Sequence, residues 1–128
     1  MIMALFGLMV QGPDRVQLLV DAFNRQDIVG MMAQVHPDIV WCHVDGAVLA
    51  VEAQGREQLE ASMIAYFEGY GQVRSELSQV CDYGSYVTAL EKVSWVREGA
   101  KRTQSALSVY HFKDGLIQSV WYFPAEKQ

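Results

Sequence analysis

Three stretches of alternating apolar and polar residues, at 86–98, 103–112 and 116–123, fill the end of the chain. Short polar segments at 98–101 and 113–115 separate them, and the second segment contains the pair Asp114-Gly115. Alternation with a period of two is typical of strands with one buried face, and Asp-Gly between two such runs is a strong hairpin signal. The end of the chain therefore predicts three consecutive antiparallel strands, with aromatic side chains on defined faces.

Helical patterns occupy most of the chain before these strands. Apolar residues recur at helical spacing after Pro13, which suits a first helical turn, and Asp27 can cap a second, shorter helix. The expected elements are helices over 13–24, 28–35 and 56–70 and strands over 38–46 and 73–83. Because the helices come before most of the strands, the order favours an α+β fold with an antiparallel sheet over an alternating α/β fold.

Such a sheet must be strongly curved, and the three N-terminal helices must cover one side of it. A pocket between the helices and the concave face is then the natural ligand site. The length of 128 residues fits one domain, and 51% apolar with 20% charged residues is typical of a globular chain. The net charge is −5 and no basic cluster is visible, so we expect no nucleic-acid partner.

Residues 1–12 form an apolar N-terminal arm. The arm lacks a basic segment and a cleavage site, and it is too short to span a bilayer, so we expect a packed or swapped arm and no membrane partner. Cys42 and Cys81 stand far apart without a metal or redox spacing, so both are expected to be free thiols of a cytoplasmic protein.

Four segments carry a family resemblance, namely residues 22–41, 43–46, 55–67 and 109–123. In their order and spacing the chain resembles the nuclear-transport-factor-2-like superfamily, in its SnoaL-like and ketosteroid-isomerase-like branch. The resemblance implies one domain over 13–128, a cone-like barrel with an internal pocket, and a homodimer paired through the sheets. It does not imply one activity, because such scaffolds host isomerases, cyclases, hydrolases, dehydratases and non-catalytic modules.

The resemblance also places family roles on residues of this chain. The general-base Asp of ketosteroid isomerases falls on His43, the oxyanion-holding Tyr falls on Leu19, and the protonated Asp falls on Ser108. The type of base is therefore changed and one donor of the oxyanion hole is lost. We do not expect steroid isomerisation by the usual mechanism, but other acid–base chemistry stays open.

His43, Glu91 and Ser108 are the candidate catalytic residues. A His on a strand that faces a pocket can move a proton near neutral pH, although it can equally be a hydrogen-bonding residue of the cavity wall. Glu91 stands among apolar neighbours, so its pKa should be raised and it should seek a partner, for which His43 is a candidate. Alternatively, Glu91 faces outward and pairs with Lys92 or Lys101.

Aromatic residues supply the predicted ligand contacts. Each could be ordinary core or dimer interface, but together they suit a flat apolar ligand. The candidate ligand-binding residues are Trp41, Tyr66, Tyr70, Trp95, Tyr110, Trp121 and Phe123. The three His residues are far apart and no dinucleotide or phosphate motif occurs, so we expect no metal and no cofactor.

The opposite face of the sheet is expected to carry apolar residues such as Val87, Leu107 and Val109. An exposed apolar face of this kind usually marks an interface, so we expect a homodimer. Two functions remain open. One is a small enzyme that uses His43 as base, with Glu91, Ser108 or Tyr110 polarising an apolar substrate. The other is a non-catalytic module that binds a ligand or another chain.

Overall fold

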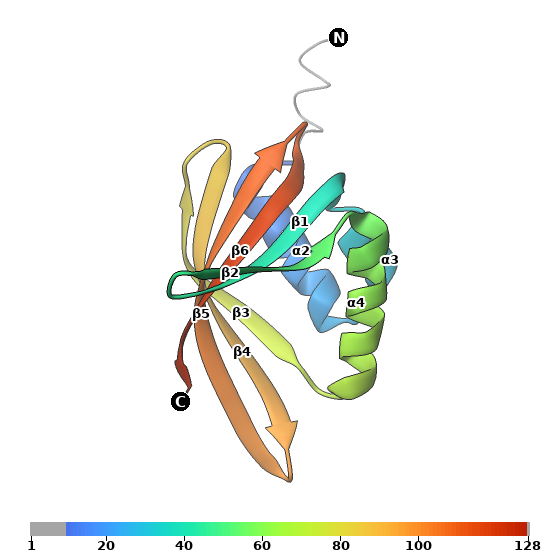
Figure 1. Cartoon of the computed structure of the whole chain (residues 1–128), viewed down its shortest axis with the longest axis vertical. Coiled ribbons are helices and arrows are strands. Elements are labelled where there is room, and N and C mark those ends of the chain that lie inside the picture. The colour runs from blue at the N-terminus through green and yellow to red at the C-terminus, as the bar shows by residue number, and fades with distance from the viewer. Residues whose placement is uncertain (1–9, 128) are drawn as a thin grey trace.

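The structure, a computed structural model, describes residues 10–127. Of the predicted N-terminal arm, residues 1–9 lie outside the described residues. The elements are α2 (Gly12–Asn24), α3 (Ile28–Met32), β1 (Val35–Asp45), β2 (Val48–Gln54), α4 (Arg56–Gly69), β3 (Arg74–Asp82), β4 (Tyr86–Arg97), β5 (Ala100–Lys113) and β6 (Leu116–Lys127). Three helices packed on one curled sheet confirm the predicted α+β class (Figure 1).

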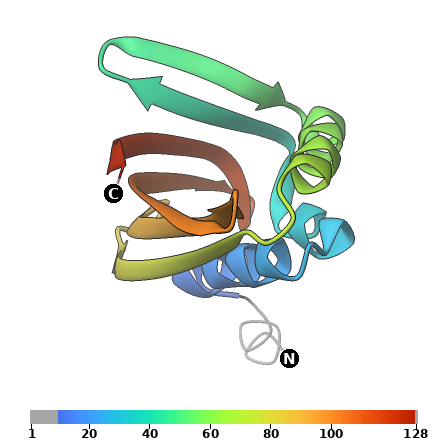
Figure 2. The same ribbon diagram turned by 90° about the horizontal axis from the view of Figure 1, so that it is seen from below.

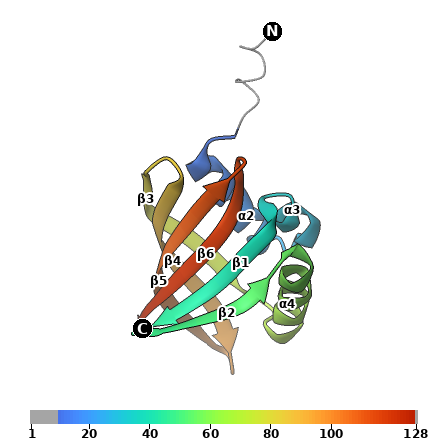
Figure 3. The same ribbon diagram turned by 45° about the horizontal axis from the view of Figure 1, so that its top comes forward.

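The described strands form one six-stranded sheet in the order β2-β1-β6-β5-β4-β3. Neighbouring strands are antiparallel except β1 and β6, which are parallel, so the sheet is mixed where we expected only antiparallel pairs. The sheet curls without closing, and its two edge strands, β2 and β3, lie on opposite sides of the view in Figure 2, with the other strands between them. Figure 3 shows the helices α2, α3 and α4 behind and beside the same sheet.

Strand β2 is the element that the sequence analysis missed. Its sequence, VLAVEAQ, shows little alternation, and only Ala53 of its seven residues is buried. A strand at the edge of a sheet pairs on one side only, so its side chains need not follow a strict inside-outside pattern. The second helix is also shorter than expected, because the chain is already extended from Val35 onward.

The core lies between α2 and the concave side of the sheet. Val16 and Leu19 of α2 meet Tyr110 and Ile117, all at most 2% exposed. Burial of each large apolar side chain contributes about 1.5–3 kcal/mol. A Cβ on Gly12 would lie 3.0 Å from Val87, so a glycine lets the start of α2 approach β4 closely.

Local signals hold α3 in place as the sequence predicted. Asp27 caps this helix, and its carboxylate accepts a 2.9 Å hydrogen bond from the Gly30 backbone nitrogen.

The position of Val87 corrects a prediction from the sequence. It was expected on the outer face, but it is fully buried opposite Tyr110, on the concave side.

A bulge in β6 changes which of its side chains face inward. The hairpin pairs Phe112 with Ile117, but the next pair is His111 with Ser119, so Gln118 is an extra residue. Each later residue of β6 is therefore shifted by one, and a shift of one moves every side chain to the opposite face. As a result Tyr122, not Trp121, lies across from Ser108.

Candidate functional site

A cavity of about 410 Å³ lies between the helices and the concave face of the sheet. This volume falls in the range of small-molecule sites. Its lining comes from every described helix and strand. The lining residues are Leu19, Val20, Phe23, Met31, Trp41, His43, Glu52, Met63, Tyr66, Tyr70, Ser75, Glu91, Val93, Trp95, Gln104, Ala106, Tyr110, Tyr122 and Pro124.

Glu91 is the buried carboxyl group of this cavity. The residue is 5% exposed, and its Oε1 accepts a 2.8 Å hydrogen bond from Ser75 Oγ. Burial raises the pKa of Glu91 from 4.5 to about 7, although hydrogen bonds from the Ser75 and Tyr122 hydroxyls act to lower it. A carboxyl with this pKa can hold or release a proton near neutral pH, as general acid–base catalysis requires.

Strand alternation explains why Glu91 faces the cavity. On β4, Ala89, Glu91 and Val93 alternate with residues of the outer face, and no bulge interrupts the pairing of β4 with β5. Glu91 lies opposite Ala106 of β5. Because Ala106 is small, the carboxyl group keeps open space above the sheet. The alternative in which Glu91 pairs with Lys92 or Lys101 in solvent is therefore wrong.

Two tyrosine hydroxyls extend this polar cluster. Tyr122 hydrogen bonds to Glu91, and burial together with the nearby Glu91 charge raises the pKa of Tyr122 well above its usual value. Tyr110 is fully buried, and the same causes raise its pKa. Its hydroxyl lies near those of Tyr122 and Ser108, but among the described residues none meets it in good hydrogen-bond geometry. Unsatisfied buried hydroxyls are rare and mark a place for a ligand or water.

Ser108 does not reach the cavity surface. It is fully buried, and its hydroxyl donates a 3.2 Å hydrogen bond to the Ala89 carbonyl. The structure therefore places Ser108 behind the lining, where it supports Tyr110. Leu19, at the position that the resemblance gives to an oxyanion-holding Tyr, does line the cavity but brings no polar atom.

His43 lies in the lining, beside Glu52 instead of Glu91. Its Nδ1 is 3.6 Å from Glu52 Oε1, and both side chains are about half exposed, at 40% and 53%. Strand β2 has a bulge here: Trp41 pairs with Ala53 and Cys42 with Val51, so Glu52 is the extra residue. His43 and Glu91 form no hydrogen bond or ion pair with each other in the described part of the chain, because β6 and β5 separate their strands. The predicted His43–Glu91 pair is thus corrected to His43–Glu52.

Aromatic rings also line the cavity. Trp41 packs on Tyr122 with 5.5 Å between ring centroids, and Tyr66 packs on Tyr70 at 4.8 Å. Burial, the neighbouring Tyr70 and the Glu91 charge raise the pKa of Tyr66. Five of the seven predicted ligand contacts thus belong to the lining, namely Trp41, Tyr66, Tyr70, Trp95 and Tyr110.

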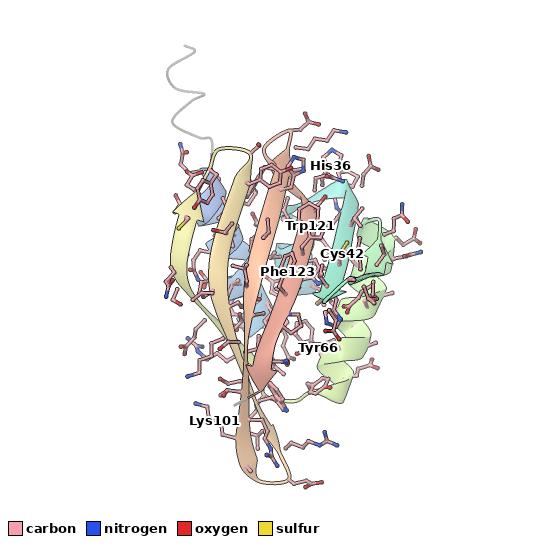
Figure 4. The ribbon with its side chains drawn as sticks, turned by 60° about the vertical axis from the view of Figure 1, so that its left-hand side comes forward. His36, Cys42, Tyr66, Lys101, Trp121 and Phe123 are labelled. Carbon is pink, nitrogen blue, oxygen red and sulfur yellow. The ribbon has the colours of Figure 1, made fainter. Side chains whose placement is uncertain are left out.

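Trp121 and Phe123 are the two exceptions. They lie on the outer face, where Trp121 pairs with Val109 and Phe123 with Leu107 (Figure 4). Without the bulge at Gln118, an Asp-Gly hairpin would have turned Trp121 inward, as the sequence analysis expected. The aromatic contact from this strand is therefore Tyr122.

Four polar residues that line the cavity were not predicted from the sequence: Glu52, Ser75, Gln104 and Tyr122. Ser75 meets Glu91 only because β3 pairs with β4, a long-range register that no local pattern determines. Glu52 belongs to the strand that was missed, and Tyr122 was hidden by the bulge. Tyr122 follows Trp121 directly in the VWYF run of β6, so a single extra residue in the strand exchanges the two rings between the faces.

The described residues contain no group of three or more His, Cys, Asp or Glu side chains that could hold a metal ion. No helix between residues 10 and 127 is long and apolar enough to cross a membrane. Cys42 is buried and Cys81 exposed, and both are free.

Comparisons with known proteins agree with this architecture. Residues 16–120 match the model of the SnoaL-like domain. No curated protein matches the chain. Solved structures with a similar fold do match the chain. An NTF2-like protein of unknown function from Burkholderia pseudomallei is 20% identical, with a TM-score of 0.76 over 91% of this chain and 92% of that one.

Two further solved structures carry an indication of ligand or activity. TerC co-crystallised with polyporic acid is 17% identical, with a TM-score of 0.74 over 87% of this chain and 88% of that one. A LEH-like epoxide hydrolase from M. tuberculosis is 14% identical, with a TM-score of 0.72 over 87% of this chain and 80% of that one. At these identities the likeness shows the fold alone.

Proposed function

Because this chain belongs to the SnoaL-like domain family, in the NTF2-like superfamily, we propose that it is an enzyme performing acid–base chemistry on an apolar small molecule. The proposal rests on the environment of Glu91. This residue is 5% exposed, its carboxyl group has a pKa of about 7, and it lines an aromatic cavity. Groups with strongly shifted pKa values in a cavity are typical of catalytic sites.

In the proposed mechanism Glu91 acts in its protonated form. Its hydroxyl donates a hydrogen bond to an oxygen of the substrate, and this bond strengthens as negative charge develops on that oxygen. Ser75 and Tyr122 hold the carboxyl group in position. The Tyr110 hydroxyl, which lacks a well-aligned partner among the described residues, is placed to share the same oxygen or a bound water.

His43 is the proposed base. Its ring takes a proton from a carbon next to the polarised oxygen, and Glu52, whose Oε1 lies 3.6 Å from Nδ1, holds the ring in position. Return of that proton to another carbon gives an isomerisation. Attack of the carbanion on a second carbonyl, whose oxygen then takes the proton back, gives a cyclisation, and loss of a hydroxyl group that leaves as water with that proton gives a dehydration. The same groups can also activate water for hydrolysis, in line with the epoxide-hydrolase likeness.

Proton exchange tests this proposal without a known substrate. A panel of ring ketones is incubated with the protein in D₂O, and NMR follows deuterium entering the carbon beside the carbonyl. We expect acceleration by the wild type and a loss of roughly 100-fold or more in Glu91→Gln and in His43→Gln. Glu76→Gln, which changes an exposed carboxylate of β3, is the control and should leave the rate unchanged. Binding of these ketones without faster exchange would instead support the non-catalytic binding module.

The outer face of the sheet supports a second proposal, that two copies pair through it. Leu107, Phe123 and Leu90 are 43%, 38% and 37% exposed on neighbouring strands. Apolar side chains this exposed on one face usually mark an interface. The proposed partners are thus an apolar small molecule and a second copy, and the two free thiols suit work in the reducing cytoplasm.

A further inference from the structure

Charged side chains are distributed unevenly around the cavity. Its titratable lining consists of Glu52, Glu91 and His43 besides the tyrosines, and the lining contains no Lys or Arg. An acidic group of a ligand would therefore meet two carboxyl groups inside the cavity and no fixed positive charge. The cavity itself suits an uncharged ligand body.

Positive charge gathers instead on the hairpin of β4 and β5, which projects past the end of α4 (Figure 1). The six residues 97–102 at its tip include Arg97, Lys101 and Arg102, and Glu98 is the one acidic residue among them. This concentration stands out in a chain whose net charge is −5.

The register shows which of these cations face the cavity side. Arg102 pairs with Trp95, and Gln104 pairs with Val93, so Arg102 continues the face that lines the cavity, about 7 Å beyond Gln104. Arg97 follows Trp95 by two residues, so it shares this face. The pairing has no bulge, and the alternation therefore holds to the tip.

Lys101 lies on the other face of the hairpin. It pairs with Val96, and Lys92, which pairs with Ser105, shares that outer face (Figure 4). Arg97 and Arg102 are diagonal neighbours across the two strands, close enough for one anionic group to contact both. Neither arginine forms an ion pair with another side chain that the structure describes.

We propose that Arg97 and Arg102, beside Trp95, form a subsite for an acidic group of the ligand. The ligand is then an elongated molecule with an uncharged ring system in the cavity and a carboxylate or similar anion at the hairpin. Guanidinium groups suit this role, because they bind carboxylate in a fixed two-pronged geometry and stack on aromatic rings. The inference rests on the proposed function for the cavity and adds the orientation of the ligand.

Two fluorescent probes that differ by one anionic group test the subsite. The probes are 8-anilinonaphthalene-1-sulfonate and its uncharged counterpart N-phenyl-1-naphthylamine. The double variant Arg97→Gln/Arg102→Gln should weaken binding of the sulfonate by about tenfold, because each solvent-exposed charge contact contributes up to about fivefold, and should leave the uncharged probe within twofold. Added salt should weaken the sulfonate for the wild type and much less for the variant.

Lys92→Gln/Lys101→Gln is the matched control, because it removes the same charge from the outer face of the same hairpin. It should leave both probes within twofold of the wild type. A loss of sulfonate affinity equal to that of the arginine variant would show only a long-range charge effect and would overturn the subsite. Equal losses for both probes in the arginine variant would also overturn it.

A cavity-filling change separates this inference from the proposed function. Ala106→Phe places a ring opposite Glu91 and should block both probes, with circular dichroism as the check on folding. Sulfonate binding that survives Ala106→Phe overturns the inference. If neither probe binds the wild type, the cavity proposal and the inference fail together. If both probes bind in the cavity and the arginine variant has no effect, the inference alone fails.

Discussion

The two faces of this sheet are made by the same strands but have opposite chemistry. On the concave face, Glu91, Tyr110 and Tyr122 bring polar groups into a buried aromatic cavity. On the convex face, Leu107 and Phe123 leave apolar rings and chains in solvent. Burial of a polar group costs free energy, whereas an apolar side chain that stays exposed contributes no burial free energy to folding. This difference underlies the two proposals, a ligand for the first face and a second copy of the chain for the second.

The largest expected effect on folding concerns the concave face and pH. The pKa of Glu91 is raised from 4.5 to about 7 in the folded chain, so the unfolded chain releases this proton first as pH rises. The stability contribution of protonated Glu91 is complete below pH 4.5 and is lost as pH rises through about 7. The loss amounts to about 3 kcal/mol.

Urea denaturation of wild type and Glu91→Gln between pH 4 and pH 8.5 measures this effect. The free energy of unfolding of the wild type should fall relative to the variant across that window, because Gln cannot ionise. Other titrating groups cancel in the difference. A difference that stays constant with pH would mean that Glu91 ionises as easily in the folded as in the unfolded chain.

Sequence alternation predicted most of the faces correctly where pairing is regular, although Val87 of β4 was placed on the wrong face. On β4, Glu91 and Trp95 were assigned to the cavity side on strand parity and the resemblance, and the pairing of β4 with β5 has no shift. On β6, one extra residue at Gln118 exchanged Trp121 for Tyr122. Alternation carries a face assignment only up to the next bulge, and nothing in the local sequence marked this one.

Long-range pairing limited the rest of the site prediction. The order of helices and strands and the resemblance gave the fold class, because they depend on local patterns and spacing. The side-chain partner of each candidate residue could not be predicted from local patterns. Ser75 reaches Glu91 through the pairing of β3 with β4, and Glu52 reaches His43 through the pairing of β2 with β1. The sequence suggested that His43 and Glu91 form a pair, but the strands β6 and β5 lie between their strands in the sheet.

The next largest effect concerns the convex face. Leu107→Glu places a charge in the proposed interface, and by symmetry each copy would bring one, so the dimer should weaken by about 2 kcal/mol or more. Leu18→Glu on α2 is the matched control, because Leu18 and Leu107 are both 43% exposed. Sedimentation velocity should show a dimer for the wild type and the control and a monomer for Leu107→Glu. A wild type that sediments as a monomer at micromolar concentration would rule out this interface.

A smaller effect separates the two faces by their tryptophans. Trp95→Ala removes a ring from the cavity wall and should weaken binding of N-phenyl-1-naphthylamine by about 1–2 kcal/mol. Trp121→Ala removes a ring of equal size from the convex face and should leave this affinity unchanged. Fluorescence titration gives both values. Equal losses in the two variants would place the probe outside the cavity.

The smallest expected effect concerns the hydroxyl that holds Glu91. Ser75 Oγ donates a hydrogen bond that favours the ionised carboxylate, so Ser75→Ala should raise the pKa of Glu91 further. One hydrogen bond to a charged group contributes about 1.5 kcal/mol, which corresponds to roughly one pH unit. Ser78→Ala, on an exposed position of the same strand, is the control. Carbon-13 NMR of the Glu91 carboxyl group measures the titration directly. The pKa should rise only in Ser75→Ala, because Ser75 hydrogen bonds to the carboxyl group and the exposed Ser78 does not. A pKa that does not move would mean that burial and the Tyr122 hydroxyl set the protonation of Glu91 without Ser75.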